Sequence, residues 1–409
     1  MPLDSDVVLL GTGAAPLVAA SQLLSAGKSV LLLNPDFDFF LEDSELPLDP
    51  LLPGVGGRFD RDRFFSNTPE RVVEVLRPHF PGAVEFKAGG GKSGFHDTQA
   101  PHVRARGRLW VAPAGKPEAW DAFENLYLEA SEGDFKPQIL EGAQASHRFP
   151  GCQSNEGAYR GLYIPKMCDV DVSRYRNGLL EFVRERLGPE RVVCDAVQIE
   201  IMPGVVRFYS GGQARTARAK NGILVFWTPK LTAWILAQTR KTEATPVIPT
   251  GIRFWEEWTL SSGPPIDPSI IGVFASVGGD LAVWGQLEGE LPTGTSPTRA
   301  VPLVALRPGP IVGIDSIYAP SAGMSWASED SFRSLFDLCG SFLKWDRVTV
   351  SAMKARAIFE WPLEKRARIW NLTNADPSVY VVPYCDGPLS QIVQSARESC
   401  ALIEVGEPT

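Results

Sequence analysis

Cysteine and histidine, the residues that most often build metal sites and disulfide frameworks, are scarce in this sequence of 409 residues. Its six cysteines stand at wide spacings without a C-x-x-C pair, which indicates neither a zinc site nor a disulfide framework. The four histidines have no paired spacing either, and this favours solvated loop residues over a catalytic base or metal ligands. We therefore expect no metal, and a reduced, cytoplasmic setting.

Positive charge is not in excess. The sequence has 40 lysines and arginines against 48 aspartates and glutamates, a formal net charge of −8. Such a chain has no general attraction to nucleic acid or anionic lipid, so we expect no nucleic-acid partner. A long uncharged stretch at residues 7–27 is interrupted by Gly11, Gly13 and Pro16, which predicts a buried strand, turn and helix and no membrane span.

The composition is otherwise that of a soluble globular protein. Hydrophobic residues make up 44% of the chain and charged residues 22%, which excludes disordered and fibrous classes. A chain of 409 residues is too long for one ordinary core, so we expect two or three domains.

The first clear chemical signal is a nucleotide-binding pattern near the N-terminus. Val7–Leu10 is an apolar run typical of a buried parallel strand. Gly11 and Gly13 then allow a tight turn close to a pyrophosphate, at the start of a helix whose amides and dipole favour negative charge. A second apolar strand, Val30–Leu33, ends at Asn34, where this pattern usually has an acidic residue that binds the ribose.

The order of these features resembles the flavin-dependent oxidoreductases of the glutathione-reductase-like fold, in particular the D-amino-acid oxidase and glycine oxidase branch. A second block, 161–173, followed by a helix and strands ending at Trp227, matches the passage of that branch from substrate domain to flavin domain. The resemblance implies an α/β fold, with a Rossmann-like FAD-binding domain interleaved with a mainly antiparallel-sheet substrate domain. The expected FAD-binding domain is 1–102, 152–236 and 346–409, and the expected substrate domain is 103–151 and 237–345.

Further elements follow from pattern. In the FAD-binding domain we predict a helix from an N-cap at Ser173 to Leu187, a third parallel strand at 191–197, a hairpin within 205–219, strands at 222–226 and 378–382, and a helix at 388–402. In the substrate domain we predict antiparallel strands at 251–260, 270–277, 281–287 and 311–318.

The resemblance implies FAD as cofactor and a small-molecule substrate, an amine or amino acid that is oxidised by hydride transfer to the flavin. Val197 matches the position whose backbone holds the adenine, and the fragment at Gly57 and Arg58 resembles a phosphate-binding G-G-R turn, although a surface turn explains it equally well. The expected cofactor-binding residues are Gly11, Thr12, Gly13, Ala14, Ala15, Asn34, Gly57, Arg58, Val197, Thr228, Asp386, Gly387 and Leu389.

Candidates for substrate chemistry are few. The planar guanidinium of Arg253 suits a substrate carboxylate, but an exposed strand arginine paired with Glu256 or Glu257 is the more common case. Tyr384 is the other candidate for the active site, as part of an aromatic pocket.

A second hypothesis stays open: a relative without flavin, or with weak flavin binding, that uses the framework to bind a protein partner. Four cofactor-facing positions depart from the resembled pattern together, and they are Pro16, Asn34, Trp227-Thr228 and Pro383-Tyr384. Trp227 in particular brings bulk to a strand end where backbone should approach the cofactor. If flavin binds, the ribose interpretation predicts that Asn34→Asp tightens binding.

Overall fold

The computed structural model describes the following residues, with short gaps inside several of the ranges: 3–34, 103–113, 124–165, 169–227, 231–262, 273–285, 303–313, 333, 340, 348–360, 369–383 and 389–405. Several predicted site residues lie outside the described residues, and these are Gly57, Arg58, Thr228, Tyr384, Asp386 and Gly387.

One half of the molecule is built on a mainly parallel sheet in the order β17-β18-β11-β1-β2-β8. Its strands are β1 (Leu3–Leu10), β2 (Val30–Leu33), β8 (Val192–Val193), β11 (Gln213–Phe226), β17 (Trp370–Asn371) and β18 (Val379–Val382). All neighbours in this order pair in parallel except β17, which is antiparallel to β18. The predicted strands at 7–10, 30–33, 222–226 and 378–382 are thus confirmed.

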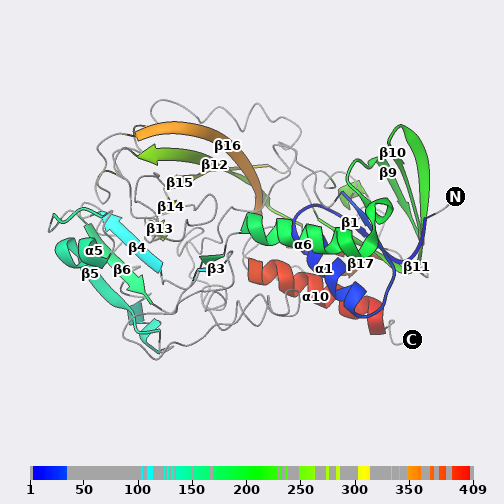
Figure 1. Cartoon of the computed structure of the whole chain (residues 1–409), viewed down its shortest axis with the longest axis horizontal. Helices are drawn as coiled ribbons and strands as arrows, with labels where there is room; N and C mark the ends of the chain where they lie inside the picture. The colour runs from blue at the N-terminus through cyan, green and yellow to red at the C-terminus, as the bar shows by residue number, and fades with distance from the viewer. Residues whose placement is uncertain are drawn as a thin grey trace.

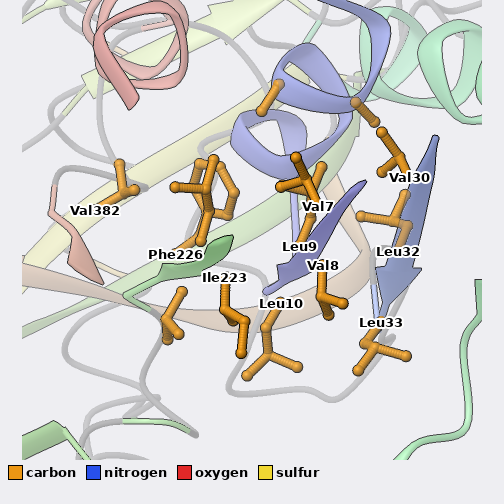
Figure 2. Close-up of a cluster of buried hydrophobic side chains, with 14 of the residues drawn as sticks. Val7, Val8, Leu9, Leu10, Val30, Leu32, Leu33, Ile223, Phe226 and Val382 are labelled. Carbon is orange, nitrogen blue, oxygen red and sulfur yellow. The ribbon is translucent and has the colours of Figure 1, made fainter. Parts of the chain in front are cut away.

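Apolar residues on successive positions of β1 explain why this strand is central. Because side chains alternate between the two faces of a strand, a continuous apolar run is buried only if both faces are covered. Figure 2 shows Val7 and Leu9 on the side of the sheet that faces the first helix, and Val8 and Leu10 on the opposite side. All four are at most 1% exposed. Buried apolar side chains therefore pack against both faces of the sheet.

Three helices lie together on one side of the sheet (Figure 1). They are α1 (Ala14–Ser25), α6 (Val172–Leu187) and α10 (Leu389–Val405), and α1 contacts both of the others. Residues 14–21 of α1 are all buried, as expected for an alanine-rich helix enclosed by neighbours. The predicted helices are confirmed, but Ser173 is the second residue of α6, so its predicted role as N-cap is wrong.

A ribbon of antiparallel strands extends the sheet beside β11. β9 (Val197–Met202) pairs with β10 (Val205–Ser210), and β10 pairs with the first half of β11. The prediction of a parallel strand over 191–197 holds only for β8, because the chain turns after Val193 and Val197 already belongs to β9. The predicted hairpin is formed by β10 and the first half of β11. Its second arm and the predicted strand at 222–226 are one continuous strand, β11, which pairs with β10 first and then continues into the core.

A separate sheet is antiparallel throughout, as predicted, in the order β13-β14-β15-β12-β16. Its strands are β12 (Gly251–Ser262), β13 (Val273–Ala275), β14 (Ala282–Gly285), β15 (Leu303–Val312) and β16 (Val348–Glu360). The predicted strand at 311–318 overlaps the described strand β15 only at Ile311 and Val312, because β15 begins earlier and includes Pro308 and Pro310. Residues 314–318 lie outside the described residues. In the described pairing β14 meets only residues 303–306 of β15, so both prolines lie where β15 has β12 alone as neighbour and the missing N–H is tolerated.

Two smaller antiparallel sheets and a short helix lie in the same half of the molecule as this antiparallel sheet (Figure 1). β4 (Arg108–Pro113), β6 (Tyr159–Ile164) and β5 (Gln138–Glu141) form a small antiparallel sheet next to α5 (Gly142–Arg148), and β3 (Val103–Arg104) pairs with β7 (Asp169–Val170). The residue boundaries of the two expected domains stay a prediction. Among the described helices, none is both long enough and apolar enough to span a membrane.

Candidate functional site

The direction in which successive strands are added to the sheet reverses at β1. From β1 the chain runs to β2 and then to β8, all toward one edge, before it returns to β11 on the other side of β1. Ligands of open parallel sheets bind at such a reversal, outside the carboxyl ends of the strands. The candidate site is therefore the turn that follows β1, next to the ends of β11 and β2.

Gly11, the first residue after β1, must be glycine for steric reasons. Its φ is 146°, and a Cβ atom added there would lie 2.7 Å from the Cβ of Phe226 at the end of β11. No pair of side-chain carbons packs that closely. The Gly11 amide donates to the Leu33 carbonyl at 3.2 Å, so this turn is held between the ends of β11 and β2.

Gly13 begins α1 in a conformation that is almost restricted to glycine. Its φ is 88° and its ψ −163°, and it caps the helix without a side-chain hydrogen bond. Ala14 and Ala15 follow, and the first turn of α1 has no acidic residue. The main-chain donors and positive dipole end of α1 are thus opposed by no carboxylate of that turn, which fits an anionic group such as a diphosphate.

Asn34 has a role that the sequence did not suggest. It is 5% exposed with φ 55°, directly after β2. Its Nδ2 donates to the Ala196 carbonyl at 2.8 Å, and its Oδ1 accepts the Ala196 amide at 2.9 Å. The predicted ribose contact remains a prediction, but the structure adds a partner 162 residues away that no local pattern could have indicated.

The segment around Ala196 is held from a second side. The Asp195 carboxylate accepts the Ser210 hydroxyl at 2.6 Å and the Gly211 amide at 2.7 Å. These hydrogen bonds, that from Ser210 first, lower the pKa of Asp195 below its ordinary value. Val197, the predicted adenine contact, follows directly and is 47% exposed. The exposed Val197 thus directly follows two residues, Asp195 and Ala196, whose positions are held by hydrogen bonds.

Trp227, the bulky residue at the end of β11, lies in the core. Its side chain is 1% exposed and meets Trp370 of β17 edge-on, with ring centroids 5.5 Å apart. Its amide donates to the Val382 carbonyl at 2.9 Å, which continues the pairing of β11 with β18. The indole of Trp227, which the sequence analysis placed beside the cofactor, is therefore packed between β11 and β17.

The other predicted residues are placed only in part. Arg253 lies on β12, opposite Ile311 of β15 and Ile358 of β16, and Leu389 is the first residue of α10. The side chains of both are outside the described part. Within the residues that the structure describes, no group of three or more histidine, cysteine, aspartate or glutamate side chains could hold a metal ion.

No protein-family model and no curated protein matches this chain. Solved structures match over nearly its whole length. NikD, an amino acid oxidase of nikkomycin biosynthesis, has a TM-score of 0.64 at 15% identity over 100% of this chain and 95% of its own. The chain has the fold of amino acid oxidases of this kind.

Two further structures agree. Glycine oxidase from Bacillus cereus has a TM-score of 0.59 at 13% identity over 98% of this chain and 96% of its own. L-alpha-glycerophosphate oxidase from Mycoplasma pneumoniae, a structure with FAD bound, has a TM-score of 0.61 at 11% identity over 98% and 94%. The resemblance to the D-amino-acid oxidase and glycine oxidase branch is thus confirmed for the fold.

Proposed function

We propose that this protein is an FAD-dependent oxidoreductase that oxidises an amine or an amino-acid-like small molecule. The observation that carries the proposal is the glycine turn at the reversal of strand order, where Gly11 packs against Phe226 and Gly13 starts α1, whose first turn has no acidic residue. A diphosphate fits this combination of close backbone, main-chain donors and helix dipole.

The structures with this fold support the rest of the proposal. NikD and the Bacillus enzyme are named as amino acid or glycine oxidases, and the Mycoplasma oxidase holds FAD. None of them supports the alternative of a flavin-free relative that binds a protein partner. Fold alone does not establish an activity, so the proposal depends on the turn itself and on experiment.

The residues have separate tasks in this proposal. Thr12, Gly13 and Ala15 offer main-chain donors to the diphosphate, while Gly11, whose amide is bonded to Leu33, lets the turn approach it. The main chain beside Val197 lines the adenine. Arg253, on β12 of the antiparallel sheet, holds the substrate carboxylate through its planar guanidinium. FAD, when bound, supplies the hydride acceptor, and the protein contributes orientation of the substrate and exclusion of water.

The first experiment is a spectrum and a melting curve of the purified protein. We expect the absorbance of oxidised flavin, and we expect a substrate amino acid to reduce the flavin and remove this absorbance when oxygen is absent. The melting temperature should rise when FAD is added. At a free FAD concentration about 100 times its Kd, mass action stabilises the native state by about 2.7 kcal/mol. A colourless protein whose melting temperature ignores added FAD would refute the proposal.

The glycine turn is tested by Gly13→Val, with Gly27→Val as the matched control. The two glycines flank α1, and both have a positive φ, 88° and 76°. Valine is strained at either position, so both variants should lower the melting temperature of the ligand-free protein. Only Gly13→Val should abolish the further rise with FAD, because only that valine blocks backbone approach to the diphosphate. Equal FAD responses in the two variants would place the phosphate elsewhere.

A further inference from the structure

We infer that Asn34 is a positioning residue for the adenine end of the cofactor site, acting through Ala196 and not by contact with the ribose. The inference rests on the proposed function, since it concerns the same FAD. It gives the position usually occupied by a ribose-binding acid a different task. It also reverses the sign of the effect expected for Asn34→Asp.

The side chain of Asn34 is committed to the protein itself. Its amide nitrogen and oxygen pair with the carbonyl and amide of one residue, Ala196, at 2.8 and 2.9 Å. This is the pattern by which two strands exchange hydrogen bonds, made here by a side chain. The main-chain amide of Asn34 also donates to the Val193 carbonyl at 2.6 Å. Both ends of the 193–196 connection are therefore hydrogen-bonded to the end of β2.

The connection leads straight to Val197. Asp195 is anchored by Ser210 and Gly211, Ala196 is anchored by Asn34, and Gln198 has a positive φ of 52°. Main chain that is fixed before a ligand arrives loses less entropy on binding than main chain that must be ordered. The hydrogen bonds of Asn34 therefore prepare the main chain beside Val197 to line the adenine.

An amide side chain can make both hydrogen bonds at neutral pH, whereas a carboxylate cannot. An ionised carboxylate accepts but does not donate, so in Asn34→Asp one oxygen would keep the Ala196 amide while the other would face the Ala196 carbonyl. At a position 5% exposed, that repulsion has little water to screen it. A protonated carboxyl, by contrast, can donate to the carbonyl and restore the pair.

This difference makes pH a direct readout. Burial and the facing carbonyl raise the pKa of the introduced carboxyl in the folded state, so its destabilising effect grows as pH rises above the pKa of the unfolded chain. Of the described elements packed against β2, α1 and β8 carry no charge, and Asp4 and Asp6 lie toward the start of β1. Among the residues that the structure describes, Glu190 and Arg191 of η1 (Pro189–Arg191), which contacts β2, and Cys194 and Asp195 of the adjoining connection are the other ionisable groups of these segments.

The experiment compares ligand-free Asn34→Asp, Asn34→Ala and wild-type protein by melting temperature from pH 5 to pH 8. The matched control is Asn221→Asp, the same change at an exposed position of β11. At pH 8 we expect Asn34→Asp to melt about 2–6 °C below the wild type. The gap should narrow toward pH 5, whereas Asn34→Ala should show a deficit that does not depend on pH and Asn221→Asp almost none.

The second arm measures binding of ADP and of FAD by calorimetry at pH 8, at a temperature where every variant is folded. Asn34→Asp should weaken ADP binding about fivefold, the equivalent of one lost hydrogen bond, and lowering the pH should recover part of it relative to the wild type. ADP is used because it carries the adenine and diphosphate without the flavin ring.

The outcomes separate the two proposals. A wild-type protein that binds neither ADP nor FAD would overturn the proposed function and the positioning role with it. Normal wild-type binding with tighter ADP binding by Asn34→Asp would overturn the positioning role alone and restore the ribose contact. Unchanged ADP affinity despite a pH-dependent loss of stability would also overturn it, because Asn34 would then be structural only.

Discussion

At the scale of single residues, the pair Asp6 and Ser29 shows how the sheet is held at the end opposite the candidate site. The Asp6 carboxylate accepts the amide and the hydroxyl of Ser29, each at 2.7 Å, and the Ser29 carbonyl accepts the amides of Asp6 and Val7. The hydrogen bond from the Ser29 amide is the main cause that lowers the pKa of Asp6 below its ordinary value. The pair joins the start of β2 to β1.

Asp6→Ala should therefore lower stability in a pH-dependent way. A carboxyl with a lowered folded pKa contributes stability above its unfolded pKa of 3.8, and that contribution is lost as pH falls through the folded value. We expect a deficit of about 1 kcal/mol at pH 7 in urea unfolding, shrinking below about pH 4. Asp4→Ala, an exposed neighbour on β1, is the control. A deficit of equal size at pH 3 would contradict this account.

At the scale of elements, β17 is attached to the sheet through the contact of Trp370 with Trp227. The Trp370 Nε1 atom is buried and has no hydrogen-bond partner among the residues that the structure describes, so the contacts seen there stabilise the indole by packing. Trp370→Phe keeps an aromatic ring at this position and removes the buried, unpaired N–H.

We expect Trp370→Phe to cost less than about 1 kcal/mol and Trp370→Ala about 2–4 kcal/mol. Urea unfolding followed by circular dichroism measures both. A loss in Trp370→Phe as large as in Trp370→Ala would show that the N–H has a partner in solution.

At the scale of the whole molecule, the candidate site is assembled from segments far apart in the sequence. The turn after β1, the end of β2 and the 193–197 connection belong to one half of the molecule, and β4, β5 and β6 belong to the other (Figure 1). Binding of FAD at the turn should suppress local opening where its donors lie, because a ligand of the native state stabilises the segments it contacts.

Hydrogen exchange with and without FAD maps this effect. We expect slower exchange at residues 11–15 and 194–198, by about tenfold or more at saturation, and a smaller change in β4–β6. Slowing confined to β4–β6 would move the nucleotide site out of the parallel sheet.

The sequence by itself determined four strands of the parallel sheet, at 7–10, 30–33, 222–226 and 378–382, together with the glycine turn and the three helices. It did not predict β17, and it did not place the end of β8. These signals are local: Val7–Leu10 is continuously apolar because both its faces are covered, and Gly11 and Gly13 adopt conformations that other residues resist. The antiparallel character of the second sheet also followed from short runs, whereas the bounds of β15 did not, since its prolines are tolerated only because of where β14 ends.

Only the tertiary structure decided what Asn34 and Trp227 do. The partner of Asn34 is 162 residues away, and the partner of Trp227 lies on another strand, β17, so neither contact leaves a pattern within a short window of sequence. A side chain's type limits which hydrogen bonds or packing it can make, but its partner depends on which strands become neighbours. For that reason the sequence indicated which residues follow the carboxyl ends of the strands, whereas the tertiary structure determined which residues they contact.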